Sequence, residues 1–315
     1  MGLPLLIPFL MIFPADSNDV IHKTFSVEEG GTLLLDTDRG SIEVGTIPEN
    51  YVKIEVIREV RRGGDESLLE DFILEFDQRG NDVEVIGKLK KPWGFKGRHI
   101  RIRFKVKVPR KYNVELKTAG GSISVEDLEG RVSTQTSGGS LHFGNITGPV
   151  EGKTSGGSIT LENCRSTAFL KTSGGSITIG DVEGNVEAHT SGGSITISRA
   201  RGNVLARTSG GGITVEEVMG TIDASTSGGS VEARISRQPE GNCRLKTSGG
   251  SIVVYLNDEV AVDVDAKTSA GKVETDFKVT VSGTIRKGEL RGEINGGGPE
   301  LYLRTSGGDI KIFRM

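Results

Sequence analysis

The stretch KTSGGSITIGDVEGNVEAHTSGGSITIS, residues 171–198, contains one phrase twice, with a threonine at the same place in each copy. Aligned on this threonine, the phrase recurs through much of the chain with a strict period of 18 residues. Self-similarity at a fixed period is the sequence signature of a repeat architecture. The threonines of the strict series are Thr118, Thr136, Thr154, Thr172, Thr190, Thr208 and Thr226, and looser copies contain Thr37, Thr247, Thr268 and Thr305.

Apolar residues occupy fixed columns of this repeat. The residue four positions before each threonine of the strict series is apolar, and so is the residue five positions after it. Polar residues lie between the apolar ones, so the chain alternates with period two on both sides of each glycine pair. Such alternation is typical of half-buried strands and not of a helix. Each repeat therefore predicts two short strands.

The constant columns also predict how the repeats are arranged. Equivalent residues stack only if successive repeats lie in parallel register, each ~4.8 Å from the next. We therefore predict an all-β protein, a flattened two-sheet parallel β-solenoid with 18-residue coils. The glycine pair is expected to turn one corner with a positive φ, and the flanking Thr and Ser to hydrogen-bond the corner backbone. Gly184 and Asn185 mark the second corner.

Composition narrows the class of protein further. The chain has 46 glycines but few aromatic residues, which make up 5% of it, so small and β-branched side chains must build the core. A net charge of −3 gives no reason to expect nucleic acid as a partner. The two cysteines, Cys164 and Cys243, fall in apolar columns several coils apart, and we expect buried free thiols.

The chain divides into three parts. Residues 1–15 begin with the apolar run MGLPLLIPFLMIFP, which predicts a signal peptide or apolar leader and therefore export to the cell envelope or the outside. A cytoplasmic location follows if this leader is not a signal. Longer alternating runs in residues 16–113 predict an N-terminal β cap continuous with the solenoid, and residues 114–315 form the repeats, with an irregular end at 256–300. No later stretch is long and apolar enough to predict a transmembrane helix.

Several segments carry a family resemblance. They are DTDRGSIEV (36–44), KVKVPRKYNVELKTAGGSISVEDLEG (105–130), the TSGGSI coils, KTSAGKVETDF (267–277) and LRTSGGDIKI (303–312). In this order they resemble the bacterial and archaeal β-strand-repeat family of unknown function labelled "putative adhesin", over roughly residues 20–315. The resemblance implies a β-solenoid, often at the cell envelope.

No catalytic, cofactor or metal site is predicted. The four histidines are scattered and none has a positioned partner that would make it a general base. A calcium roll has coils of the same length, but it needs aspartates where TSGGSIT has hydroxyls. We therefore expect a protein that is not an enzyme and needs no cofactor.

The densest basic segment predicts an interaction surface in the cap. Residues 88–111 combine a basic strand with two aromatic residues in the preceding turn, a composition that suits an anionic surface or an envelope glycan. A neighbouring acidic strand containing Glu70, Asp71, Glu75 and Asp77 could neutralise the basic strand instead. The candidate residues are Lys91, Trp93, Phe95, Lys96, Arg101, Arg103, Lys105 and Lys107.

A second candidate surface is a ladder of hydroxyl groups. Ser and Thr recur at i and i+2 on an outward face of successive coils, which could fit ice or a glycan; the alternative is that Thr is simply a good exposed strand residue. The ladder residues are Ser158, Thr160, Ser176, Thr178, Ser194, Thr196 and Thr214.

Together these patterns predict a non-catalytic β-solenoid of the cell envelope or surface, with an adhesin-like binding or structural role. An intracellular scaffold or envelope-stress regulatory protein is the alternative, and a glycan-active enzyme or a hydroxyl-ladder binder is less favoured.

Overall fold

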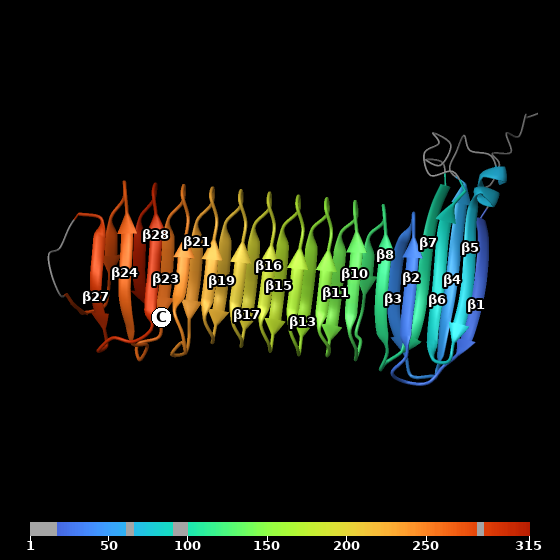
Figure 1. The fold of residues 1–315 in the computed structure, drawn as a ribbon, viewed down its shortest axis with the longest axis horizontal. Helices are drawn as coiled ribbons and strands as arrows, with labels where there is room; N and C mark the ends of the chain where they lie inside the picture. The colour runs from blue at the N-terminus through green and yellow to red at the C-terminus, as the bar shows by residue number, and fades with distance from the viewer. Residues whose placement is uncertain (1–17, 61–65, 91–99, 282–286) are drawn as a thin grey trace, which may run out of the picture.

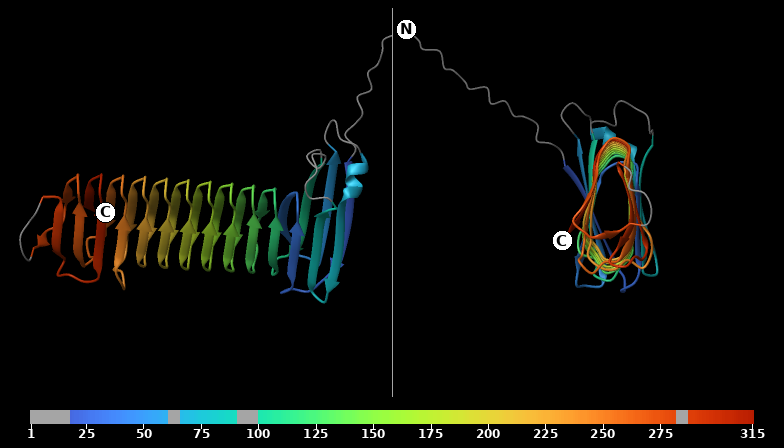
Figure 2. Two further views of the ribbon diagram at one scale, coloured as in Figure 1. Left: turned by 45° about the horizontal axis from the view of Figure 1, so that its top comes forward. Right: turned by 90° about the vertical axis from the view of Figure 1, so that its left-hand side faces the viewer.

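The computed structural model describes residues 18–60, 66–90, 100–281 and 287–315. Its strands form two long sheets that face each other along a narrow solenoid (Figures 1 and 2). We call the 14-stranded sheet, which contains β9 and β17, sheet A, and the 15-stranded sheet, which contains β8 and β16, sheet B. The described helical structure is one 3-10 turn, η1 (Glu66–Asp71). The predicted fold class is confirmed.

Each central coil contributes one strand to each sheet. In sheet B these are β8 (Asn113–Thr118), β10 (Val132–Thr136), β12 (Val150–Lys153), β14 (Ala168–Lys171), β16 (Val186–His189), β18 (Val204–Arg207), β20 (Ile222–Ser225) and β22 (Cys243–Lys246). In sheet A they are β9 (Ile123–Val125), β11 (Leu141–Ile146), β13 (Ile159–Cys164), β15 (Ile177–Val182), β17 (Ile195–Ala200), β19 (Ile213–Val218), β21 (Val231–Ile235) and β23 (Ile252–Leu256). Neighbouring coils pair in parallel with equivalent residues opposite each other, as in Ile159↔Ile177↔Ile195.

The predicted apolar columns form one continuous core between the sheets. Ile177, Ile195 and Ala188 are completely buried in it. Cys164 and Cys243 are buried free thiols, as predicted, and burial raises the pKa of both. No single coil could bury its apolar face alone, so stacking on neighbours stabilises every coil.

The threonine of each TSGG phrase links its corner by hydrogen bonds to the neighbouring coil of the stack. The Thr172 hydroxyl donates to the carbonyl oxygen of Gly157 at 2.7 Å, and the N–H of Gly175 donates to the same hydroxyl at 3.4 Å. Thr190 repeats both contacts one coil later. Because the threonines are buried, these bonds satisfy polar groups that would otherwise be left unpaired away from water.

The glycine pair was predicted to have a positive φ, and this prediction was wrong. Within the described residues, the glycines with positive φ are Gly30, Gly40, Gly80, Gly288, Gly296 and Gly297, and none belongs to a TSGG phrase. The second glycine is required by close stacking instead: a Cβ on Gly157 would lie 2.1 Å from the carbonyl oxygen of Gly139. A Cβ on the first glycine, Gly156, would have 3.5 Å to its nearest neighbours.

Longer strands form the N-terminal end. They are β1 (Asn18–Ser26), β2 (Thr32–Thr37), β3 (Ser41–Ile47), β4 (Tyr51–Val60), β5 (Phe72–Arg79), β6 (Asp82–Leu89) and β7 (Ile100–Pro109). Strands β2 and β3 stack on β8 and β9 as an ordinary coil, and β6 and β7 pair with them in parallel. Antiparallel β4, β1 and β5 lie outermost, so parallel stacking stops here.

The C-terminal end is not stacked in sequence order. Its strands are β24 (Val262–Thr268), β25 (Val273–Thr275), β26 (Val279–Thr280), β27 (Glu289–Ile294), β28 (Glu300–Thr305) and β29 (Ile310–Arg314). Strand β28 lies between β22 and β24, and β29 lies between β23 and β25. The last coil of the chain is therefore inserted between two earlier coils, and antiparallel β27 and β26 lie beyond them.

Candidate functional site

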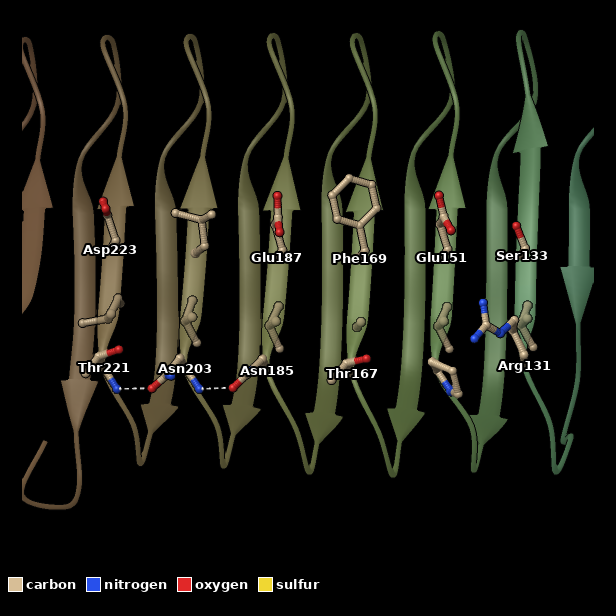
Figure 3. A pocket seen from close by; sticks show the side chains of 18 of the residues that line it. Arg131, Ser133, Glu151, Thr167, Phe169, Asn185, Glu187, Asn203, Thr221 and Asp223 are labelled. Atoms are coloured by element: carbon tan, nitrogen blue, oxygen red, sulfur yellow. Dashed lines mark hydrogen bonds between the residues drawn. The ribbon is translucent and has the colours of Figure 1, made fainter. Parts of the chain in front are cut away.

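A shallow groove of about 530 Å³ runs along the outer face of sheet B from Arg131 to Asn242 (Figure 3). Two rows of outward side chains form its sides, and the backbone between them forms its floor. The acidic row consists of Ser133, Glu151, Phe169, Glu187, Leu205 and Asp223. The amide row consists of Arg131, Pro149, Thr167, Asn185, Asn203, Thr221 and Asn242.

Parallel register creates both rows. Phe169 lies opposite Glu187, and Glu187 lies opposite Leu205, because equivalent positions of successive coils are paired. Each row therefore advances by one strand spacing, ~4.8 Å, per coil. From β10 to β22 there are six such spacings, so the groove is ~29 Å long.

The amide row holds its hydrogen-bond donors in a fixed orientation. Oδ1 of Asn185 accepts the backbone N–H of Asn203 at 2.8 Å, and Oδ1 of Asn203 accepts the N–H of Thr221 at 2.9 Å (Figure 3). Oδ1 of Asn242 accepts the N–H of Glu300 at 2.9 Å. In the described part of the chain the three side-chain NH₂ groups have no partner, and all three residues are exposed. Since the backbone fixes each amide, its two N–H donors point to solvent, and the amides are spaced by one coil between Asn185 and Asn203 and by two coils between Asn203 and Asn242.

The acidic row alternates charge with apolar surface. Glu151, Glu187 and Asp223 occur at every second coil, ~9.6 Å apart, with Phe169 and Leu205 between them. Each carboxylate has a basic neighbour in the adjacent outward column, and the pairs are Glu151–Lys153 at 2.5 Å, Glu187–His189 at 2.8 Å and Asp223–Arg207 at 3.8 Å.

The ring of Phe169 is half-buried between neighbours. The Nζ of Lys153 lies 5.3 Å from its ring centroid, and the imidazole of His189 lies 6.3 Å from it. Lys153 and His189 thus hold the Phe169 ring in place beside the groove floor.

This arrangement suits binding better than catalysis. Glycoside hydrolysis needs two carboxyl groups on opposite sides of the scissile bond. The groove carboxylates all lie in one row, and the amide row facing them contains none. Among the residues that the structure describes, no cluster of three His, Cys, Asp or Glu side chains could hold a metal ion.

A second groove, of about 510 Å³, runs along the corner where the sheet A strands end. Part of its lining is paired: Arg199 pairs with Asp181 at 3.2 Å and with Glu217 at 2.7 Å, and the Asn145 amide donates to Asp127 at 2.7 Å. These contacts lower the pKa of Asp127 and Glu217. Among the described residues, the lining side chains of Arg165, Glu183 and Arg201 make no ion pair.

The predicted hydroxyl ladder lies on the outer face of sheet A. Thr160, Thr178, Thr196 and Thr214 are paired in register, so the Thr column exists as expected. The serine column has a structural task, because each hydroxyl accepts the backbone N–H of the next coil. Ser158 accepts from Ser176 at 3.3 Å, Ser176 from Ser194 at 3.2 Å, and Ser194 from Gly212 at 3.3 Å.

The predicted basic surface is only partly described. Lys91, Trp93, Phe95 and Lys96 lie outside the described residues. Arg101, Arg103, Lys105 and Lys107 alternate with buried residues along β7 and point outward, as the sequence predicted.

Acidic residues do neutralise part of this stripe, but not those proposed. Arg103 pairs with Glu59 and Lys105 with Glu55, both on β4. Glu75 and Asp77 lie on β5, in the opposite sheet, and Glu70 and Asp71 precede it in η1. The error arose because β4 returns antiparallel beside β7, a pairing that alternation alone does not reveal.

Sequence reasoning missed the groove. The Asn of each Gly-Asn pair was interpreted only as part of a corner, although it recurs at Asn185, Asn203 and Asn242. This recurrence of Asn was the signal in the sequence that could have revealed the groove. The facing acidic row repeats a carboxylate only at every second coil, at Glu151, Glu187 and Asp223, so its signal in the sequence is weaker.

Comparison with known proteins identifies the family. Residues 32–313 match the family model described as Toastrack DUF4097, so the chain belongs to the DUF4097 family. No curated protein matches it. No helix in the described ranges is long and apolar enough to cross a membrane.

Three solved structures that match the chain share little sequence with it. One described as a "putative cell adhesion protein", from Clostridium sporogenes, is 12% identical, with a TM-score of 0.32 and coverage of 96% of this chain and 100% of that one. A "putative adhesin" from Bacteroides fragilis is 13% identical (TM-score 0.32, coverage 94% and 97%). A "putative lipid binding protein" from Parabacteroides distasonis is 12% identical (TM-score 0.31, coverage 94% and 97%).

Proposed function

We propose that this DUF4097 protein is a non-catalytic binding protein whose sheet B groove holds an extended glycan chain along the solenoid axis. The observation that carries this proposal is the amide row, in which Asn185, Asn203 and Asn242 present NH₂ groups fixed by the backbone. Fixed donors lose little conformational entropy when a ligand binds, which favours affinity.

The other features of the groove suit a polyhydroxylated chain. Sugar hydroxyls both donate and accept, so they can bind the amide NH₂ groups on one side and the free carboxylate oxygens on the other. Phe169 offers an apolar ring face to the C–H face of a sugar ring. Each contact is weak, and a chain that meets several coils at once gains from their sum.

The same proposal places the protein at the cell envelope or outside the cell. Its support is the apolar leader at residues 1–15, which has the character of an export signal. A long, narrow solenoid with a lateral groove would suit a structural or adhesive role there.

Calorimetric titration of the full chain with cellohexaose, chitohexaose and mannohexaose tests the groove. The informative variant is Asn185→Asp/Asn203→Asp, because each new carboxylate still accepts the backbone N–H while the NH₂ donors are lost. We expect one hexaose to bind the native chain and to bind this variant at least tenfold more weakly, about 1.4 kcal/mol. Thr178→Val, on the outer face of sheet A, is the control and should bind normally. Absence of binding to all three sugars, or equal affinity for the double variant, would refute the proposal.

The basic strand β7 remains a second candidate surface, for anionic membranes or polymers. Within the described residues Arg101 and Lys107 have no ion pair, unlike Arg103 and Lys105 between them. Binding to vesicles with anionic lipid that Arg101→Glu/Lys107→Glu abolishes would support this role, and binding unchanged by the double variant would exclude it.

A further inference from the structure

The acidic row of sheet B changes its charge where the groove ends. Arg244 follows Asp223 in the acidic row, and Tyr302 of the inserted strand β28 follows Arg244. In the adjacent outward column Lys246 lies opposite Arg304. Insertion of the last coil thus brings side chains far apart in sequence onto one patch next to Asn242.

The patch is built around the ring of Tyr302. The Arg304 guanidinium lies 4.0 Å from the ring centroid, Lys246 Nζ lies 5.1 Å from it, and the Arg244 guanidinium lies 5.5 Å from it. Three cations therefore surround one half-buried aromatic ring, which holds them near each other by cation–π attraction.

Two of these cations are not neutralised. Arg304 is bound to Asp265 at 2.5 Å, and Arg291 binds the same carboxylate at 3.1 Å. Asp223, which lies opposite Arg244 on β20, pairs with Arg207. Glu300, whose N–H donates to Asn242, makes no ion pair within the described residues. In the described chain Arg244 and Lys246 contact no carboxylate, and the Tyr302 hydroxyl has no hydrogen-bond partner.

We propose that Arg244, Lys246 and Tyr302 form a subsite for an oxyanion, a carboxylate or a phosphate or sulfate ester, at the C-terminal end of the groove. A guanidinium, an ammonium and a phenol together offer charged and neutral donors to such a group, and the Arg fork fits it in a bidentate manner. The inference rests on the proposed glycan-binding function and names its substrate class: a neutral glycan that carries one acidic group.

The charges that line the sheet B groove favour a ligand with only one acidic group. The groove is lined by the carboxylates Glu151, Glu187 and Asp223 and by one cation, Arg131. The basic partners of the three carboxylates, Lys153, His189 and Arg207, lie in the adjacent column outside the groove. A polymer with a negative charge on every unit would meet these carboxylates and be disfavoured, since like charges at close range raise the free energy of binding. A neutral stretch with one acidic end avoids this repulsion, and its acidic end must lie toward β28.

Two oligosaccharides that differ by one charge test the subsite. Cellohexaose reduced at its reducing end to the open-chain alcohol, and the same hexaose oxidised there to the open-chain carboxylate, are titrated into the full chain at low salt. We expect the carboxylate form to bind about tenfold more tightly, with the advantage shrinking as salt screens the charges. The variant Arg244→Gln/Lys246→Gln should bind both forms alike. Arg234→Gln, which removes a comparable arginine 4.8 Å from the ring of Tyr255 on sheet A, should retain the advantage.

A third titration separates this inference from the groove itself. Sodium sulfate alone is followed through the backbone N–H signals of β22 and β28 in NMR spectra of the native chain and the double variant. A saturable shift that disappears in Arg244→Gln/Lys246→Gln supports the subsite even if neither hexaose binds. Equal affinity for the two hexaoses, an advantage that survives the double variant, or no saturable sulfate shift in the native chain would each overturn it.

Discussion

The TSGG corners of the solenoid have the same residues and contacts from coil to coil, whereas the residues on the outer face of sheet B vary. Every TSGG corner repeats the same contacts, a Thr hydroxyl on a Gly carbonyl and a glycine stacked against the glycine below. The outer face of sheet B changes from coil to coil, from Glu187 to Leu205 to Asp223. The constant corner residues are needed for coils to stack, whereas the variable residues on the outer face of sheet B are available to bind a ligand. Substitutions at corners should therefore cost stability, and substitutions on faces should leave it nearly unchanged.

The largest effect is expected at a corner glycine. Gly157→Ala places a Cβ 2.1 Å from the carbonyl oxygen of Gly139, so the backbone must shift and the stacking of two coils is disturbed. We expect a loss of about 3 kcal/mol in unfolding free energy. Gly156→Ala is the control; its Cβ has 3.5 Å of space and should change stability by less than about 1 kcal/mol. Urea unfolding of both variants measures the difference, and equal midpoints would contradict the stacking explanation.

The next largest effect is expected at a corner threonine. Thr172→Val keeps the shape but removes the hydroxyl that donates to Gly157 and accepts from Gly175. The partly buried Gly157 carbonyl and Gly175 N–H lose their partner, which should cost about 1–3 kcal/mol in urea unfolding. A variant as stable as the native chain would show that water replaces the hydroxyl at this corner.

A smaller, pH-dependent effect is expected at Asp265 on the face of sheet B. Burial raises its pKa, but the hydrogen bonds and charges of Arg304 and Arg291 outweigh burial and leave the pKa below the ordinary value of 3.8. A lowered folded-state pKa stabilises the protein above the unfolded value, and this stability is lost as pH falls through the folded value. Asp265→Asn should thus cost about 1 kcal/mol or less at pH 7.

The same variant has a distinct acid response. Thermal melting between pH 7 and pH 2 should show the gap between native chain and Asp265→Asn closing below the ordinary carboxyl pKa, about pH 4. A gap that stays constant to pH 2 would mean that the charge of Asp265 contributes nothing.

The smallest effect is expected for the same Thr-to-Val change on a face. The Thr178 side chain is exposed, and its hydroxyl has no partner in the described residues. Thr178→Val should change unfolding free energy by no more than about 0.5 kcal/mol. Measured beside Thr172→Val, it tests the comparison directly, because the chemical change is the same and only its position differs. Similar losses in the two variants would remove the distinction between corner and face.

Much of the central solenoid could be predicted from the sequence. The columns that contain Ile159, Ile177 and Ile195 predicted the parallel register, and the position of Cys164 within a column predicted its burial. These predictions succeed because side-chain alternation and repeat length are local properties of the chain.

Predictions about contacts between distant segments were less successful. The glycine pair suggested positive φ because glycine is the usual residue there, but the real constraint is a carbonyl oxygen one coil below. The basic strand β7 was matched with the wrong acidic residues, since Glu55 and Glu59 come beside it only through antiparallel pairing. The candidate groove needs side chains from seven coils, and no local pattern reveals which of them share a face.

The sequence by itself determined that this chain stacks as a two-sheet solenoid, because apolar columns repeated at 18 residues are buried only when coils lie in register. Only the tertiary structure decided which coils become neighbours at the ends. Strands β24 and β28 carry the same alternating pattern, so either could have stacked on β22. The structure places β28 there, and that choice brings Tyr302 beside Arg244 at the end of the groove.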